Sequence, residues 1–359
     1  MVDLLPELAR LVAFDTQNPG GDEPALARYL RDRLQQHVPD VLEVVEVPRV
    51  RQRGAYVYAA WGRPRVLVNA HLDTVPPSPG WGAAPHRPRV ESDRLIGLGA
   101  ADVKGSIAAI LKALDLARPT NLAILFSGDE ECAGTVMMAF LASARREGLA
   151  QAVVCEPTRC GPGTRHRGVL AMEVTVGGEG AHSSRADDLP APIAELAYAA
   201  VALHGWGQAR RNVGPPGFPG MCMNVAKLAG GVAFNIVPEQ ATLIFSLRPP
   251  PGVDIDTLES ELADLVHAHV PRADIATPVA SAAFATRDFA AFVPLLGEVG
   301  PPCDLGFWTE AALLSGAGID AVVFGPGDIR QAHAPDEFVS LAQLERARDV
   351  FVQLIHAAG

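Results

Sequence analysis

The sequence predicts an α/β domain that is interrupted by an inserted α+β domain, and three observations support this fold class. The chain has 359 residues, more than one core usually organises, so about two domains are expected. In the first half, apolar runs of strand length alternate with helical patterns. From Gly168 onward, that alternation gives way to half-polar strands and amphipathic helices. We therefore expect one domain from residues 1–167 and 279–359, and an inserted domain at 168–278.

The first domain is expected to have three layers, with helices on both faces of a sheet. Its first half contains helical patterns at 25–34, 107–117 and 138–144, and strand-like runs at 66–69, 122–126 and 152–155. This alternation is typical of a parallel or mixed sheet covered by helices. After residue 284 the same pattern returns, with a buried type of strand at 321–324 and a last helix at 341–355.

The inserted domain has a different order of elements. Its candidate elements are a strand at 170–176, a helix at 190–204, strands at 223–228 and 241–247, a helix at 255–269 and an apolar segment near Ile275. This βαββαβ order predicts a split βαβ sandwich of the ferredoxin-like kind. The stretch 213–220, rich in Pro and Gly, is expected to be an exposed loop.

Composition excludes several classes of protein. Hydrophobic residues make up 48% of the chain and charged residues 20%, which excludes bulk disorder. A net charge of −11 repels nucleic acid and anionic membranes. No apolar run approaches the ~18 residues of a membrane span, and the N-terminus carries Asp3 and Glu7 where an export signal would be cationic. The five cysteines form no CxxC pair, so we expect a cytoplasmic protein without disulfides.

Polar side chains stand just after several of the apolar runs. They are His71 and Asp73 after VLVNA, Asp102 after the run 94–96, Glu130 and Glu131 after LAILF, Glu156 after AVVC, and His333 downstream of AVVF. In an open α/β sheet the carboxyl ends of the strands share one edge, so residues distant in sequence can meet there. The sequence therefore predicts that these groups converge.

Two imidazoles with three or four carboxylates and no thiolate are typical ligands of zinc, cobalt or manganese. Two divalent ions held by Asp102, Glu131 and Glu156 would keep a net positive charge, which lowers the pKa of a bound water. Asp102 is the best candidate for a carboxylate shared between the ions. Asp73 lies two residues after His71, so it is expected to orient that imidazole.

Glu130 and Glu131 are neighbours, which favours two roles, one as a metal ligand and one as a general base. The alternative is that both acids merely stabilise the first turn of the following helix. A dinucleotide site is a second alternative, because GLGAAD at 97–102 resembles GxGxxG. Asp102 replaces the third glycine there and would repel a pyrophosphate. Serine catalysis is disfavoured because GxSxG is absent.

The motifs resemble those of the dinuclear zinc hydrolases that include acetylornithine deacetylase, succinyl-diaminopimelate desuccinylase, aminoacylase and carboxypeptidase G. The matching segments are VNAHLDTVP (68–76), GLGAADVKG (97–105), FSGDEECAGT (126–135), VVCEPT (153–158), GEGAHSSR (178–185) and AHAPDEFV (332–339). The resemblance implies a zinc-exopeptidase-like catalytic domain with an inserted lid and dimerisation domain, and hence a homodimer.

The resemblance also implies roles for single residues. His71, Asp102 and Glu156 would hold one ion, and Asp102, Glu131 and His333 the other. Glu130 would be the general base, with Asp73 orienting His71. In the insert, His182 would stabilise the oxyanion, in its own or a partner's site. Arg167, Asn235 and Arg248 resemble residues that bind the substrate carboxylate, since an arginine fork binds both carboxylate oxygens.

The segment after residue 306 resembles acetylornithine and acetylcitrulline deacetylases most closely. We therefore expect hydrolysis of an N-acetyl amino acid, with N-acetyl-L-ornithine first and N-acetyl-L-citrulline as the alternative, and a place in arginine biosynthesis. Glu310 could pair with the ornithine ammonium. Phe307 and Trp308 replace a Gly/Ser/Thr-rich desuccinylase segment, so desuccinylation is disfavoured. A dipeptidase and a non-catalytic metal-dependent binding protein are further alternatives.

Overall fold

The computed structural model describes residues 4–49, 53–132 and 134–359. The chain forms two compact units. The first comprises the described residues of Met1–Thr164 together with Ala285–Leu305 and Thr309–Gly359, and the second comprises Arg165–Phe284 and Gly306–Trp308. The predicted insert, residues 168–278, falls within the second unit.

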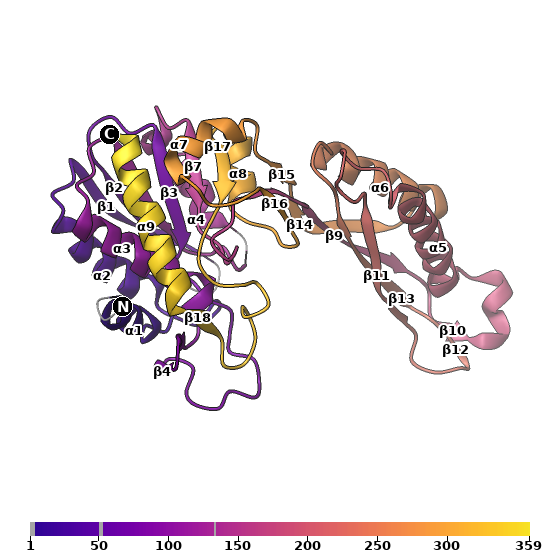
Figure 1. The fold of residues 1–359 in the computed structure, drawn as a ribbon. Coiled ribbons are helices and arrows are strands. Elements are labelled where there is room, and N and C mark those ends of the chain that lie inside the picture. Colours follow the sequence, from indigo (N-terminus) through magenta and orange to yellow (C-terminus); the bar gives the residue numbers. More distant parts are fainter. Residues whose placement is uncertain (1–3, 50–52, 133) are drawn as a thin grey trace. The chain divides into compact units, whose positions relative to one another are not determined.

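A large mixed sheet organises the first unit (Figure 1). Its strands are β1 (Val41–Pro48), β2 (Arg53–Ala60), β3 (Val66–His71), β6 (Leu122–Ser127), β7 (Gln151–Val154), β8 (Gly163–His166), β15 (Phe284–Ala285), β16 (Cys303–Leu305) and β17 (Asp320–Val323). Their order is β1-β2-β6-β3-β7-β17-β8-β15, with β16 beside β8. Strand β3 runs parallel to β6 and β7, and β7 runs parallel to β17. The carboxyl ends of these four strands therefore share one edge.

Helices cover both faces of this sheet. They are α1 (Leu5–Val12), α2 (Glu23–Gln35), α3 (Gly105–Leu116), α4 (Thr135–Leu141), α7 (Val293–Leu296), α8 (Ala311–Gly316) and α9 (Leu341–Ala358). Alternate strand residues such as Val57 and Val68 pack in one core with α1, α2, α3, α7 and α9. On the other face, Tyr56 and Tyr58 contact Phe140 of α4, with ring centroids 5.9 and 5.6 Å apart. Helix α8 contacts β17 and β7.

A small sheet and a short helical turn complete the first unit near the carboxyl ends of the strands. Strands β4 (Arg89–Glu91), β5 (Arg94–Ile96) and β18 (Phe338–Ser340) pair in the order β18-β5-β4. The turn η1 (Ala100–Lys104) follows β5 and leads directly into α3. Short 3-10 turns occur at η2 (Ala144–Arg146) and η4 (Phe289–Phe292).

The second unit is an antiparallel sheet with two helices packed on it (Figure 1). Its elements are β9 (Val169–Gly177), α5 (Pro192–Arg210), β11 (Cys222–Gly230), β13 (Gln240–Arg248), α6 (Ile255–His269) and β14 (Asp274–Ser281), with β10 (Ala181–His182), η3 (Ser183–Asp188) and β12 (Ile236–Val237) between them. The sheet order β11-β13-β9-β14 is that of a split βαβ sandwich. Residues such as Met172 and Phe245 alternate inward toward Leu203 and Leu262.

The predicted fold class is confirmed, both in the three-layer α/β/α domain and in the βαββαβ order of the second unit. The hairpin of β1 and β2 was not predicted, and it adds an antiparallel edge to the otherwise parallel centre of the sheet. Within the described ranges, no helix is both long enough and apolar enough to span a membrane.

Candidate metal centre

His71 is the last residue of β3 and one of the groups predicted to converge at the carboxyl edge. Every position of β3 is buried, and the imidazole is 2% exposed. A strand buried on both faces must be apolar along most of its length, and the run VLVNA meets that need. His71 thus extends from a rigid element into the edge where β6 and β7 also end.

Asp102 lies between the two histidines. One carboxylate oxygen, Oδ1, is 3.1 Å from His71 Nε2, and the other, Oδ2, is 3.3 Å from His333 Nε2. The turn η1 carries Asp102, which is 6% exposed. A carboxylate that directs each oxygen toward a different imidazole has the geometry that sharing between two cations requires.

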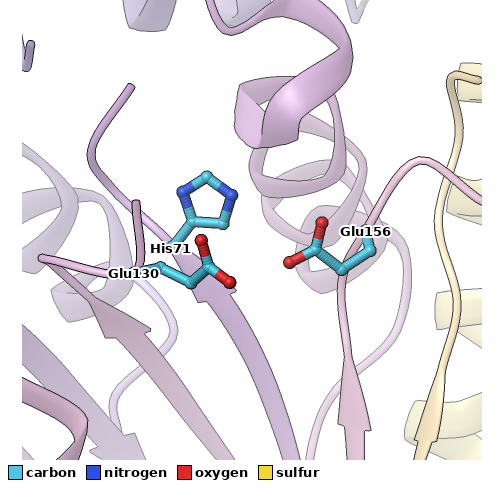
Figure 2. A group of neighbouring side chains, drawn as sticks. All are labelled: His71, Glu130 and Glu156. Atoms are coloured by element: carbon cyan, nitrogen blue, oxygen red, sulfur yellow. The ribbon is translucent and has the colours of Figure 1, made fainter. Parts of the chain in front are cut away.

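Glu130 and Glu131 follow β6 after a close turn at Gly128. A Cβ at Gly128 would lie 1.7 Å from Glu23 Oε2 and 3.1 Å from the carbonyl oxygen of Ala55, so any larger residue there would displace the Glu23 side chain. Glu131 Oε1 lies 3.1 Å from His333 Nε2. Figure 2 shows the Glu130 carboxylate extending toward the space beside His71.

Glu156 enters the same space from the loop after β7 (Figure 2). Possible ligand atoms of His71, Glu130 and Glu156 all lie within 4.8 Å of one another. The same limit holds for His71 with Asp102 and Glu131. The structure therefore brings together every residue that was expected to bind metal.

The grouping differs in one respect from the expected ligand sets. Glu130, expected to act as a base, lies in a close group with His71 and Glu156, where Asp102 was expected. Asp102 instead shares its closest contacts with His71 and His333. The reason is local, since the loop after β6 carries the Glu130 side chain toward the end of β7.

Asp73 orients more than one neighbour. The carbonyl oxygen of Asp73 is 3.0 Å from His71 Nδ1, whereas its carboxylate Oδ1 is 3.5 Å away. The carboxylate accepts backbone N–H bonds from Glu130 at 3.1 Å and Glu131 at 3.2 Å. It also accepts a bond from Asn18 Nδ2 at 2.9 Å. Asp73 thus holds both the imidazole of His71 and the backbone of the two glutamates.

Burial, neighbouring charges and hydrogen bonds shift the pKa values of the side chains in this cluster. Burial and then the charge of Glu156 raise the pKa of Glu130 well above its usual value. Burial and then the charge of Asp102 do the same to the pKa of Glu156. Hydrogen bonds that His333 donates to the carboxylates of Asp102 and Glu131 raise the pKa of His333 to about 10. Burial opposes the charged form of His71, but its bonds to Asp102 and Asp73 hold its pKa well above normal.

These residues fit a pair of divalent cations. Four carboxylates, those of Asp102, Glu130, Glu131 and Glu156, surround two imidazoles. Their possible ligand atoms lie within 4.8 Å of one another in two groups that share His71, and two of the carboxylates lie 3.1 and 3.3 Å from His333. Such crowding is costly without positive charge between the acids. Nitrogen and oxygen donors without thiolate suit zinc, cobalt or manganese.

Glu310 is a buried neighbour of this cluster in the first unit. It is 1% exposed, and its Oε2 accepts a bond of 2.6 Å from Ser127 Oγ. Asn69 Nδ2 in turn donates to Ser127 Oγ at 2.9 Å. Burial raises the pKa of Glu310 to about 7. Burial therefore favours the neutral form of this carboxyl group more than water would.

The remaining predicted residues belong to the second unit, where they form two pairs. Strand β10 pairs with β12, and Ser183 N–H donates to the carbonyl oxygen of Asn235 at 3.0 Å, so exposed His182 and Asn235 are neighbours. Gly168 N–H donates to the carbonyl oxygen of Pro249 at 2.9 Å, which brings the segments of Arg167 and Arg248 together.

Arg167 and Arg248 differ in their surroundings. One terminal nitrogen of Arg167 donates to the carbonyl oxygen of Gly220 at 3.0 Å, while its buried Nε has no hydrogen-bond partner among the described residues. Arg248 is exposed at the end of β13. Arg167 is therefore held by Gly220 while its Nε–H remains available, whereas Arg248 is exposed to solvent.

Asn18 and Glu337 were not predicted to contribute to this site. Asn18 lies in a loop before α2, and the sequence around it carries no motif that would have found it. Glu337 lies within the motif AHAPDEFV, but the motif gives no sign that this carboxyl group is buried.

The fold and the cluster together are those of a metal-dependent hydrolase. The chain belongs to peptidase family M20/M25/M40, whose model matches residues 67–357. The predicted resemblance and the predicted hydrolase class are thereby confirmed.

Two curated proteins and one solved structure are similar to this chain over nearly its whole length. The chain is 37% identical to N-acetyl-L-citrulline deacetylase of Xanthomonas campestris pv. campestris, covering 96% of this chain and 95% of the relative. It is 31% identical to acetylornithine deacetylase of Myxococcus xanthus over 100% of both chains. Its fold resembles that of an M20 family metallo-carboxypeptidase from Sulfolobus solfataricus, with a TM-score of 0.78, 17% identity, and coverage of 100% and 99%.

Proposed function

We propose that this protein is a metal-dependent deacetylase of N-acetyl amino acids, with N-acetyl-L-ornithine as the first candidate substrate. The observation that carries the proposal is the convergence of His71, His333 and the carboxylates at one sheet edge. The similarity to an acetylornithine deacetylase over the whole chain supports the reaction. Its place would then be in arginine biosynthesis.

The proposed ligands are those that the resemblance implies. His71, Asp102 and Glu156 would hold one cation, and Asp102, Glu131 and His333 the other. Zinc is the first candidate, with cobalt or manganese as alternatives. When bound, such a pair of cations polarises the amide carbonyl and lowers the pKa of water.

Glu130 is the proposed general base. It takes a proton from the water that attacks the acetyl carbon and delivers that proton to the amine as the C–N bond breaks. Products are acetate and the free amino acid. Burial and the charge of Glu156 raise the pKa of Glu130, which makes its carboxylate a stronger base than an exposed one.

The second unit is proposed to supply the substrate contacts and to form a lid. His182 would stabilise the oxyanion, and its neighbour Asn235 would bind the substrate. Arg167 and Arg248 would bind the substrate carboxylate, for which the free Nε of Arg167 is suited. The same unit would mediate a homodimer. We also propose a cytoplasmic location, which suits five free cysteines.

N-acetyl-L-citrulline is the second candidate substrate, and one observation favours it. The relative at 37% identity is an N-acetyl-L-citrulline deacetylase. Glu310, proposed to contact the substrate side chain, is enclosed and has a pKa of about 7. A partly protonated carboxyl group can donate to a neutral ureido oxygen as well as attract an ammonium group.

The test compares hydrolysis of N-acetyl-L-ornithine, N-acetyl-L-citrulline and N-acetyl-L-methionine by zinc-loaded protein. We expect kcat/KM for the ornithine or the citrulline derivative to exceed that for methionine by about 10-fold or more, as a polar contact to the side chain requires. Glu310→Gln should reduce the preference for ornithine over citrulline. Equal rates on all three substrates would contradict the proposed contact between Glu310 and the substrate side chain. If the protein binds two ions but hydrolyses none of the substrates, a non-catalytic binding protein would be favoured.

A further inference from the structure

Glu337 is a buried acid beside the metal centre for which the proposed mechanism has no role. It follows His333 by four positions, lies directly before β18 and is 2% exposed. Its Oε2 accepts a backbone hydrogen bond from Gly99 at 2.9 Å. Its Oε1 accepts two more, from Ala101 at 2.9 Å and from Asp102 at 3.0 Å. Both oxygens therefore hold the loop that carries Asp102.

The main chain of Glu337 holds the start of the same loop. Its carbonyl oxygen accepts a hydrogen bond of 2.8 Å from Gly97 N–H, beside the pairing of β18 with β5. Gly99 has a left-handed φ of +78°, and a Cβ there would lie 2.8 Å from Thr74 Cγ2. This loop shape leaves amide groups without helical partners, and a buried amide without a partner is costly. Glu337 supplies the missing acceptors.

We infer that Glu337 is a positioning residue that fixes Asp102 relative to His333 and thereby sets the affinity for the cation these two residues share. This inference rests on the two-cation site of the proposed function. One short segment carries His333 and Glu337, and Glu337 grips the backbone of Asp102 itself. Three amide N–H groups donate to the two oxygens of this one side chain, so the loop has little freedom to shift.

A neutral amide cannot replace this carboxylate. Gln has one acceptor oxygen and one NH2 donor, so either the Gly99 amide or the pair from Ala101 and Asp102 would face a donor. Groups that orient metal ligands typically change metal affinity by about 10- to 100-fold when they are altered. Glu337→Gln should therefore weaken one of the two cation sites without removing any ligand.

Asp320 offers a matched control because it makes the same kind of contact at the opposite edge of the sheet. It begins β17 and is 8% exposed. Its carboxylate accepts backbone bonds from Arg287 at 2.9 Å, Asp288 at 3.0 Å and Ala321 at 3.0 Å. Asp320→Asn thus reports what losing such a buried carboxylate does to folding alone.

The experiment titrates zinc into the metal-free wild type, Glu337→Gln and Asp320→Asn in competition with a chromophoric chelator, and follows thermal unfolding of each. We expect Glu337→Gln to bind one cation at least about 10-fold more weakly than the wild type. Asp320→Asn should unfold at a lower temperature yet bind both cations as the wild type does. A folded Glu337→Gln protein with two cations at wild-type affinity would overturn the inference.

Glu337→Asp keeps the test decisive if the Gln variant does not fold. Asp retains the carboxyl group but is one methylene shorter, so it cannot reach all three amides. Weakened binding of one cation is expected again, and unchanged binding would contradict the inference. A wild-type protein that binds no cation would overturn the proposed function instead, so the two failures are distinguishable.

Discussion

Glu130 and Glu131 are adjacent in the chain, yet their side chains face different neighbours. Glu131 Oε1 lies 3.1 Å from His333, whereas Glu130 lies in a close group with His71 and Glu156. The carboxylate of Asp73 accepts the backbone N–H of both glutamates and so fixes the direction in which each side chain leaves the loop. One glutamate can therefore bind a cation while the other moves a proton.

Replacement of Glu130 by Ala separates these two roles. We expect Glu130→Ala to keep both cations and to lose about 10²- to 10⁴-fold in kcat, because the proton has no carrier. Steady-state kinetics and metal content of the same preparation measure both quantities. Glu131→Ala is the comparison, and it should lose a cation. Loss of a cation from Glu130→Ala as well would mean that Glu130 is a ligand, as its place beside His71 and Glu156 would also allow.

We expect His37 to make the stability of the first unit depend on pH. Its buried Nε2 has no hydrogen-bond partner in the described part of the chain, although Asp115 Oδ1 lies 3.5 Å away. Burial lowers the pKa of His37 from 6.5, with Asp115 opposing the shift and Arg33 adding to it. A lowered pKa means that the unfolded chain binds the proton more tightly, so stability is lost as pH falls through 6.5.

His37→Gln removes this titration. Between pH 7.5 and 5.5 the urea midpoint of the wild type should fall more steeply than that of His37→Gln. His356→Gln, at an exposed position of α9, is the control and should follow the wild type. Parallel curves for wild type and His37→Gln would exclude His37 as a source of the pH dependence.

Residues that follow strands could be predicted from the sequence, and residues that hold loops could not. His71 and Glu156 stand directly after apolar runs, so the strand pattern locates them. Glu337 binds an amide 235 positions away, at Asp102, and Asn18 binds Asp73 across 55 positions. Contacts of that kind depend on how two irregular segments meet, and neither segment carries a periodic signal.

Helix α9 anchors the end of the chain to the sheet. Phe351 of α9 meets Phe324, which follows β17, with ring centroids 5.9 Å apart and planes at 87°. Both side chains are 0–2% exposed. Edge-to-face pairs of this kind add to the burial of apolar area. Because α9 follows β18 directly, this packing also secures the segment that carries Glu337.

Phe351→Ala should lower the free energy of unfolding by about 3–5 kcal/mol, since it removes a ring from a closed core. His356→Ala, on the exposed face of the same helix, should change it by less than about 0.5 kcal/mol. Urea denaturation followed by circular dichroism measures both. A loss below 1 kcal/mol in Phe351→Ala would contradict this expectation, because it is about 2 kcal/mol less than the smallest loss expected. It would show that the core repacks around the missing ring.

Some strands could be predicted from the sequence and others could not. Strands β3 and β6 are buried at every position and appear as continuous apolar runs, which made them predictable. Strand β1 lies at the sheet edge, half-buried along most of its length, and includes Glu43 and Glu46 among its valines. Its pattern is therefore weak, and its pairing with β2 depends on a hairpin register that the sequence does not specify.

At the scale of the whole chain, the order of elements was predictable and the neighbours in the sheet were not. Alternating apolar runs indicated an α/β domain, and the βαββαβ order indicated the split βαβ sandwich. The order β6-β3-β7-β17 decides which loops meet. It places the loop with Glu130 and the loop with Glu156 on either side of His71. The order of the elements along the chain does not determine this arrangement.

The second unit carries an apolar surface that supports the proposed homodimer. Tyr198 and Val201 of α5 are 70% and 72% exposed and lie three positions apart, so they share one helix face. Helix α5 packs beside β11, which is the first strand of its sheet and therefore has one edge without a strand partner among the described residues. Exposed apolar side chains beside an open strand edge are typical of a surface covered by another chain.

Val201→Glu tests whether a second copy covers this surface. If it does, the substitution places an unpaired carboxylate in an apolar interface, which costs more than ~1.4 kcal/mol and weakens association at least about tenfold. Sedimentation velocity at several protein concentrations should then show monomer where the wild type is dimeric. Val293→Glu, a half-exposed position of α7 in the first unit, should remain dimeric. A wild type that sediments as a monomer at all concentrations would refute the dimer, and a dimeric Val201→Glu would place its interface elsewhere.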